Sequence, residues 1–215
     1  MSETATTPTI MDRLKAETQD LHDAAETHAH QSAMVKGELP LESYIAHLAQ
    51  HYLVHEALEA HLRGATEVHP AFTEVITAQQ YQAPYAEEDL RHFGVDPTVL
   101  EPTPGTSALI AQIDAAAREH PIKLLGYHYV LEGSNNGNRF IAMKLKKVYE
   151  LEDGKGLKYL DPYGTAQRAN WAEFKRQMLR LSFTAEHQDL MVQAAREMFE
   201  GITQISTDLV AASAS

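Results

Sequence analysis

The sequence predicts an all-α fold: one domain of roughly seven to nine helices formed by the 215 residues. Apolar residues recur every three or four positions through most of the chain, and no β-type alternation of useful length appears. Hydrophobic residues make up 44% of the chain, which is enough for a buried core. Residues 1–6 and 211–215 lack this pattern, and we expect them to be frayed.

The first two predicted helices are long and amphipathic. The segment 7–28 begins with Thr7 as its N-cap and Pro8 at the first helical position, where the missing amide of proline is no loss. The segment 39–62 repeats apolar residues at helical spacing, and Gly64 ends it. The apolar stripes contain Leu14, Thr18, Leu21 and Ala25 in the first helix and Tyr44, Leu48, Tyr52, Ala57 and Leu58 in the second.

Shorter helices are expected in the middle of the chain and longer ones at its end. The shorter ones cover residues 71–80, 86–94 and 107–120. Ser107 is expected to open the third of these. An amphipathic helix over 168–181 follows two turns, "EDGKG" and "DPYG". Thr184 caps the last helix, which has Glu186 in its first turn and runs through 191–210.

The stretch "HYVLEGSNNGNRFIAMKLKK", residues 128–147, is a predicted helix with weak helix formers at its centre. Glycine inside a helix costs about 1 kcal/mol relative to alanine, and Gly133 and Gly137 lie one turn apart. One interpretation is a loop between two helices. The other is a single helix bent at both glycines, which clear one face so that a flat ligand can lie against the backbone.

Composition excludes several classes of protein. The chain has no cysteine, which removes disulfides, thiolate metal sites and thiol nucleophiles and is typical of a reducing compartment. No apolar run approaches the about 18 residues of a membrane span. The first residues lack the pattern of a secretory signal. We therefore expect a cytoplasmic protein with no membrane partner.

The net charge of −12 disfavours nucleic acid as a partner, but the charge is unevenly distributed. Residues 139–180 carry 10 Lys and Arg against 5 Asp and Glu, whereas residues 1–138 carry 7 against 20. A basic region on an acidic protein predicts an anionic ligand or partner. The alternative is chance clustering of charge on a solvated helix face.

His22 lies beside the apolar stripe of the first predicted helix. Lys15, seven residues earlier, lies within about 20° of His22 around the helix and roughly 10.5 Å away along the axis. A neutral imidazole is a good iron ligand, and one histidine can hold a heme whose propionates meet a cation two turns away. The alternative is a histidine packed at the margin of the core.

His47, His51 and His55 recur at every fourth position, and Glu59 continues the same helix face. Two histidines at this spacing can share a metal ion. A dinuclear site in a helical bundle, as in carboxylate-bridged oxidases, is therefore one interpretation. The other places these rings at the surface or at the margin of the core.

Two groups of basic residues lie on the predicted helices of the basic region. They are Lys144, Lys146 and Lys147 in one helix, and Lys175, Arg176 and Arg180 in the next. Each group is either an ordinary exposed helix face or a site for carboxylates or an electron-donor protein, since Lys and Arg form charge-assisted hydrogen bonds with carboxylates.

Taken together, these segments resemble the heme oxygenases, and the bacterial branch most. "LKAETQDLHDAAE" is similar to the family's first helix, where a histidine binds the heme iron; here that histidine is His22. "YIAHLAQHYLVHEALEAHL" is similar to the second helix. "YVLEGSNNGNRF" is similar to the "YV(x)EGSNLG" stretch of the distal helix. The likeness runs from about Ile10 to the last helix, with the three motifs in the family's order.

The resemblance implies an all-α, single-domain heme-oxygenase-like bundle over residues 1–215 with a kinked distal helix. It places His22 on the proximal side of the iron, Lys15 at a propionate, and Lys175 or Arg180 near a second basic contact. The other implied positions are Asn135 and Phe199 as heme contacts, and Gly133, Ser134 and Gly137 as the distal catalytic group.

The implied activity is oxidative cleavage of heme, as cofactor and substrate, to biliverdin, CO and ferrous iron. It uses O₂ and electrons from a ferredoxin or a flavoprotein reductase, which would dock on the basic region. Asn136 and Asn138 depart from the motif, where the family has an apolar and a small residue. The alternatives are heme binding without turnover and a non-heme metal oxidase. The related thiamin-degrading enzymes use a cysteine, which this chain lacks.

Overall fold

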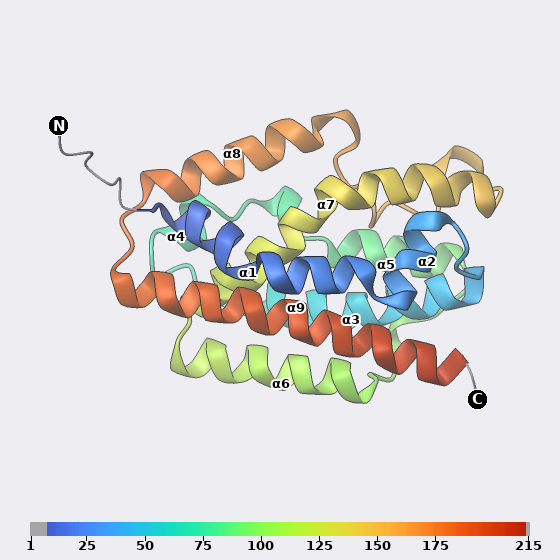
Figure 1. Cartoon of the computed structure of the whole chain (residues 1–215), viewed down its shortest axis with the longest axis horizontal. Coiled ribbons are helices and arrows are strands. Elements are labelled where there is room, and N and C mark those ends of the chain that lie inside the picture. The colour runs from blue at the N-terminus through green and yellow to red at the C-terminus, as the bar shows by residue number, and fades with distance from the viewer. Residues whose placement is uncertain (1–7, 214–215) are drawn as a thin grey trace.

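The computed structural model describes residues 8–213, which form nine α-helices, four 3-10 helices and no strand (Figure 1). The α-helices are α1 (Ile10–Thr27), α2 (Ala29–Lys36), α3 (Leu41–Gly64), α4 (Ala71–Glu74), α5 (Ala83–His92), α6 (Pro104–Glu119), α7 (Lys123–Val148), α8 (Gln167–Arg180) and α9 (Ala185–Ser213). The 3-10 helices are η1 (Ala78–Gln80), η2 (Pro97–Val99), η3 (Glu152–Gly154) and η4 (Gly164–Ala166). The predicted all-α class is therefore confirmed.

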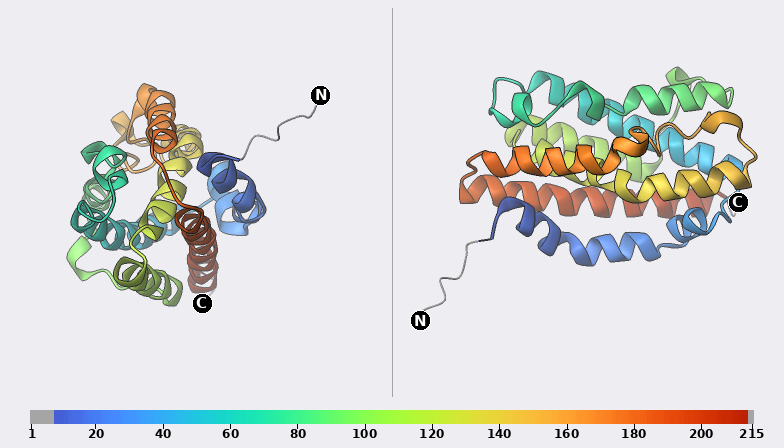
Figure 2. Two further views of the ribbon diagram at one scale, coloured as in Figure 1. Left: turned by 90° about the vertical axis from the view of Figure 1, so that its left-hand side faces the viewer. Right: turned by 90° about the horizontal axis from the view of Figure 1, so that it is seen from above.

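Helix α9 is the main packing surface of the bundle. Helices α7, α1 and α6 all pack along it, and α1 and α6 flank it on opposite sides in Figure 1. Helix α3 packs against α5 and α6. The end-on view in Figure 2 shows α7 near the centre, surrounded by the other long helices. Helix α7 packs against α2, α3, α6, α8 and α9, and these neighbours together fix its position.

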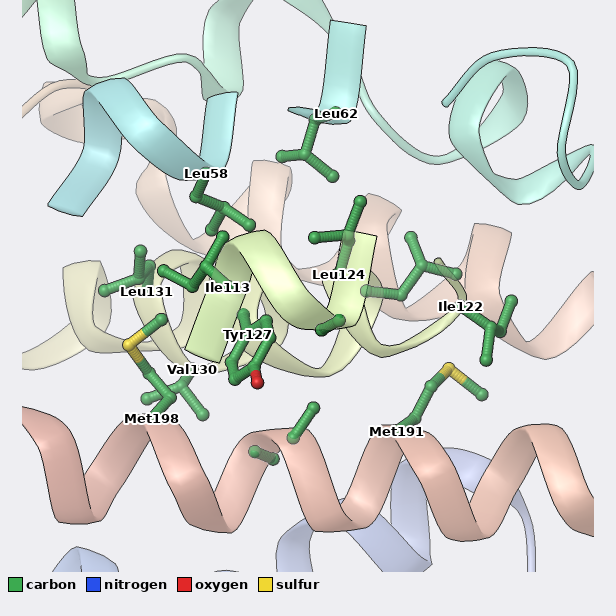
Figure 3. Packing of buried hydrophobic residues seen from close by; sticks show 14 of the residues in the cluster. Leu58, Leu62, Ile113, Ile122, Leu124, Tyr127, Val130, Leu131, Met191 and Met198 are labelled. Carbon is green, nitrogen blue, oxygen red and sulfur yellow. The ribbon is translucent and has the colours of Figure 1, made fainter. Parts of the chain in front are cut away.

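Two apolar clusters fill the bundle, and α7 contributes to both. The larger packs α7 against α9 and includes Tyr127, Val130, Met191 and Met198 (Figure 3). The smaller packs the second half of α7 against α2, α3 and the segment 157–160, and includes Met34, Tyr44, Leu48, Leu145 and Leu160. The two halves of α7 are thus held by different neighbours.

The start of α1 is set by a capping box. The Asp12 amide donates to Thr9 Oγ1 at 3.2 Å, and the Thr9 amide donates to Asp12 Oδ2 at 3.0 Å. This reciprocal pair satisfies two amides that have no helical partner. The predicted cap, Thr7, lies outside the described residues.

The predicted N-cap of α6 is wrong, whereas the predicted N-cap of α9 is confirmed. Helix α6 is capped by Thr103 and begins at Pro104, so Ser107 does not open it. Proline at the first position extends the helix because its ring is already in helical geometry. At α9, the His187 amide donates to Thr184 Oγ1 at 3.1 Å, as predicted.

The "EGSNNGN" stretch is helical. Helix α7 runs from Lys123 to Val148 without interruption, so the single-helix interpretation is confirmed and the loop interpretation is wrong. Its ribbon changes direction part-way along in Figure 1. Ser134 Oγ donates to the Leu131 carbonyl at 2.7 Å, and Asn136 Nδ2 donates to the Gly133 carbonyl at 2.9 Å. Side-chain bonds of this kind compete with the helical ladder and bend a helix.

Gly126 sets how closely α7 approaches α9. A Cβ at this position would collide with the Met191 carbonyl and lie 2.9 Å from the Ala194 Cβ. Two backbones can meet this closely only where a glycine leaves room. The contact fixes the first half of α7 against α9.

The segments outside the long helices differ from expectation in two places. The predicted helix over 71–80 is shorter: α4 ends at Glu74, and η1 follows. Helix α9 continues through Ser213, so Ala211–Ser213 are not frayed, and residues 1–6 and 214–215 lie outside the described part. Among residues 8–213, no helix combines the length and apolarity needed to cross a membrane.

Candidate functional site

His22 presents an exposed imidazole on α1, with 46% of its side chain accessible. Its ring meets the ring of Phe199 from α9 edge-on, with centroids 5.8 Å apart. Its Nδ1 lies 3.5 Å from Asp23 Oδ1, and its Nε2 lies 3.8 Å from Glu26 Oε1. The structure thus brings together His22 and Phe199, two of the predicted site residues, and leaves the imidazole accessible to a ligand.

The basic residues predicted for the site are all exposed. Lys15 projects from α1 and makes none of the ion pairs found within residues 8–213. Lys175 on α8 places its Nζ 5.8 Å from the centroid of Trp171, a cation–π contact. Arg180 ends α8. Arg176 instead pairs with Glu173, so its charge is already compensated.

The glycines of α7 face different surroundings. A Cβ at Gly137 would meet nothing within 4 Å, so this face of the helix is open. A Cβ at Gly133 would lie 3.4 Å from Trp171 Cη2, in ordinary contact with the aromatic ring. Phe140, one turn beyond Gly137, is 71% exposed. Together these residues form an open, flat and partly aromatic face, which we call the glycine face.

Ser134 and Asn138 border the glycine face and bond to each other. Asn138 Nδ2 donates to Ser134 Oγ at 3.2 Å, while the Ser134 hydroxyl donates to the Leu131 carbonyl. The hydroxyl proton of Ser134 is therefore engaged, and the free capacity of its oxygen is as an acceptor. This oxygen can therefore accept one further hydrogen bond.

Asn135 lies on the reverse side of α7, roughly 160° around the helix from Gly137. It is fully buried, and its Nδ2 lies 3.4 Å from Glu132 Oε2. The structure therefore separates Asn135 from the exposed site residues.

Glu132 is a fully buried carboxyl on the same reverse side. Burial raises its pKa to about 7, against hydrogen bonds from Tyr163, Asn135 and Gln82 that lower it. The Tyr163 hydroxyl donates to Glu132 Oε2 at 2.8 Å. A buried carboxyl that holds its proton near neutral pH is a typical proton donor in enzymes.

His47, His51 and His55 are buried, with exposures of 3%, 7% and 3%. The interpretation that places them at the surface or the core margin is wrong, because His30 and Tyr159 cover them. They also form no three-ligand metal site within the described residues.

The group of three that could meet on one ion within residues 8–213 is His22, Asp23 and Glu26. All three are exposed on one turn of α1. Such a cluster is common on acidic surfaces, and its chemical interest lies in the imidazole alone.

A cavity of about 530 Å³ lies on the reverse side of α7, bordered by α5 and the segment 153–161. Its α7 residues are Ala142, Met143 and Lys146, and Lys146 projects about 180° away from Gly137. None of the residues predicted to contact heme or to form the distal catalytic group lines this cavity. It is therefore separate from the glycine face.

Comparison with known proteins identifies the family. A heme oxygenase family model matches residues 9–208, which is nearly the whole chain. This chain belongs to the heme oxygenase family. A search of curated individual proteins found no match.

Solved structures share the heme oxygenase fold with this chain. The heme oxygenase of Leptospira interrogans is 21% identical, with a TM-score of 0.85 over 93% of this chain and 99% of that one. Heme oxygenase-2 from Synechocystis sp. PCC 6803, in complex with heme and NO, is 20% identical, with a TM-score of 0.87 over 94% and 85%. A TenA homologue from Pyrococcus furiosus is 11% identical, with a TM-score of 0.71 over 94% and 100%. The predicted heme-oxygenase-like bundle is confirmed.

Three residues of the candidate site escaped the sequence analysis. Trp171 packs against Gly133, Phe140 extends the glycine face, and Glu132 is buried behind it. The helical period did offer one signal, because Phe140 follows Gly137 by three residues and so shares its side of the helix. The contact of Trp171 has no such signal, since it comes from another helix.

Proposed function

We propose that this protein opens the heme ring oxidatively, releasing biliverdin, CO and ferrous iron with O₂ and external electrons. The observation that carries the proposal is the exposed imidazole of His22 beside Phe199, in a chain of the heme oxygenase family. A neutral imidazole is a suitable axial ligand for heme iron. Heme itself would supply the iron at which O₂ is activated.

The open face at Gly137 supports a flat substrate. A helix without side chains on one side can lie directly against a porphyrin, and a Cβ at this position meets nothing. In this proposal the glycine face of α7 covers one side of heme and shields most of its edge. The Ser134 oxygen, as an acceptor, would hold a water molecule there rather than donate its own proton.

The exposed cations support binding of the propionates. Lys15 lies on α1 with His22, and Lys175 is held near Gly133 through Trp171. Charge-assisted bonds to carboxylates would orient the ring in its plane. Arg180, at the end of α8, would be a further cation for this purpose. Asn135 would act indirectly, by supporting Glu132 behind the helix.

The electron donor would be an acidic protein such as a ferredoxin or a flavoprotein reductase. Residues 139–180 contain the excess of positive charge, and Lys144, Lys146 and Lys147 are exposed on α7. Opposite charges steer association and make its rate fall as salt rises. The reduction rate should therefore decrease with ionic strength.

Heme binding without turnover is a second candidate, favoured by Asn136 and Asn138 in the helix that would cover the heme. An experiment on one preparation of the protein distinguishes heme opening from heme binding alone. Hemin is titrated into the protein, and a Soret band that saturates at one equivalent indicates a specific site. Reductant and O₂ are then added. Conversion of that band to biliverdin supports the proposed function, and its persistence supports binding alone.

A further inference from the structure

Five buried side chains form a row that the proposed function does not use. The histidine row consists of His30, His47, His51, Tyr159 and His55. Each is at least nine-tenths buried. The rings of His30 and His47 stack with centroids 5.2 Å apart, and those of His47 and His51 are 4.1 Å apart. The row starts on α2, at the outside of the bundle (Figure 1), and runs along α3.

Tyr159 joins the two parts of the row. Its hydroxyl lies 3.1 Å from His51 Nδ1 and 3.4 Å from His55 Nε2. Its backbone amide donates to Asp89 Oδ2 at 2.7 Å, which holds the residue in place. A hydroxyl has one proton and two lone pairs, so it can donate to one imidazole while it accepts from the other.

Three ring nitrogens of the row have no protein partner: His30 Nε2, His47 Nδ1 and His51 Nε2. Buried polar atoms are nearly always hydrogen-bonded, so ordered water is expected at these atoms. Burial lowers the pKa of His30 to about 4 and of His51 to about 3, so these rings are neutral near pH 7. A neutral imidazole has one donor and one acceptor, as a relay requires.

The inner end of the row lies on α3, which packs against α7. His55 Nδ1 lies 3.2 Å from Glu59 Oε1. Burial lowers the pKa of His128 to about 4; the charge of Glu59 raises it and His55 lowers it further, so both act electrostatically on the His128 ring. His128 Nε2 and Glu132 Oε1 lack a protein partner and lie one turn apart on α7. One water molecule could bridge these two atoms.

We propose that the histidine row carries protons from α2 to the carboxyl of Glu132. When a proton moves inward, the Nδ1–H bond of His51 breaks and Tyr159 Oη gains that proton. The O–H bond of Tyr159 breaks in the same event, and His55 Nε2 gains its proton. His51 Nε2 takes a proton from the water expected there, and His55 passes its Nδ1 proton to Glu59, from which water and the His128 ring carry it to Glu132. No phenolate, imidazolate or imidazolium therefore remains in the row. The inference rests on the proposed function, because reduction of O₂ during heme opening consumes protons.

The test is deuterium exchange at Glu132 in the protein without heme. A buried protonated carboxyl has an infrared C=O band that shifts on deuteration, and its loss in Glu132→Gln assigns it. Tyr159→Phe keeps the aromatic ring and removes the hydroxyl that joins His51 to His55. Tyr149→Phe is the matched control, because that hydroxyl donates to the Leu39 carbonyl outside the row.

We expect Tyr149→Phe to exchange like wild type and Tyr159→Phe to exchange at least about tenfold more slowly. His51→Leu interrupts the row at a second point and gives the same result should Tyr159→Phe fail to fold. The proposal would be overturned if folded Tyr159→Phe and His51→Leu exchanged at the wild-type rate, or if the carboxyl band persisted in Glu132→Gln.

The outcome is independent of biliverdin formation. If Glu132 exchanges through the row but the protein leaves heme intact, the proton path is supported and the proposed function is wrong. If the protein forms biliverdin but Tyr159→Phe exchanges at the wild-type rate, only the proton path is wrong.

Discussion

His22 is the residue on which the proposed attachment of heme most depends, because its imidazole is exposed and meets Phe199. His22→Ala should preserve the fold, since an exposed side chain contributes little to stability. It should remove the iron–imidazole signature of bound heme in resonance Raman spectra. His61→Ala, on α3, is the control and should leave the signature unchanged. The same signature in His22→Ala and wild type would assign the ligand to another residue.

Lys15→Ala should weaken heme binding modestly. A partly exposed charge-assisted contact contributes roughly 1–3 kcal/mol, so the dissociation constant should rise by about one to two decades at most. The heme should also gain freedom to rotate in its plane, which would change the ratio of biliverdin isomers. Titration with hemin and chromatography of the product measure both effects. If neither changes, Lys15 does not contact the propionates.

Gly137→Leu should abolish biliverdin formation without destabilising the protein. The added side chain enters open space at the glycine face, which the porphyrin would otherwise occupy. Leucine in a helix is favoured over glycine by somewhat under 1 kcal/mol, so the melting temperature should be equal or higher. Melting temperature, hemin affinity and biliverdin yield are measured on one preparation.

The matched control is Gly64→Leu, because Gly64 is also helical and also has nothing within 4 Å of an added Cβ. It should gain stability and keep its biliverdin yield. A near-normal yield from Gly137→Leu would show that the substrate does not lie against the glycine face.

At the scale of the helix, the sequence left α7 open to two interpretations because local propensity and tertiary packing disagree. Gly133 and Gly137 weaken the helix, whereas both ends are embedded in apolar clusters that hold it. Ser134 and Asn136 bond to backbone carbonyls, a local effect that composition does not reveal. The motif located the candidate site, but Asn135 lies behind it only because residues 133–138 are helical, which the sequence left open.

The spacing of His47, His51 and His55 predicted a shared helix face correctly and its surroundings wrongly. Every fourth position on a helix points the same way, which the sequence can show. Burial depends on the partners, and Tyr159 lies more than 100 residues along the chain from His51. Such contacts between distant segments are not encoded in any local pattern.

Gly126→Ala tests the packing of α7 on α9. The added methyl would collide with the Met191 carbonyl, so the helices must separate. Overpacking costs typically about 1–3 kcal/mol, and a backbone contact that cannot rotate away belongs at the upper end. Urea denaturation should show this loss in the free energy of unfolding. Gly64→Ala should instead stabilise the protein by up to about 1 kcal/mol. An unchanged free energy in Gly126→Ala would contradict the close contact.

For the whole molecule, buried ionisable groups set the dependence of stability on pH. His30, His51 and His128 have pKa values lowered by burial to about 4, 3 and 4. Below pH 6.5 the unfolded chain binds protons that the folded chain does not, so stability falls as pH falls. Glu132 acts in the opposite direction: its pKa of about 7 means that the folded chain keeps a proton that the unfolded chain loses above about 4.5.

The histidines should prevail because they outnumber the opposing carboxyl groups, Glu132 and Asp89. Each neutral histidine contributes roughly 2 kcal/mol to the loss of stability between pH 6.5 and 5, at 1.36 kcal/mol per pKa unit. Thermal melts should therefore show a lower melting temperature at pH 5 than at pH 7.5. His128→Gln should flatten this dependence, because glutamine does not titrate, whereas a glutamine at the exposed His120 should leave it unchanged. A melting temperature that rises toward pH 5 would contradict the expected dominance of the buried histidines over Glu132 and Asp89.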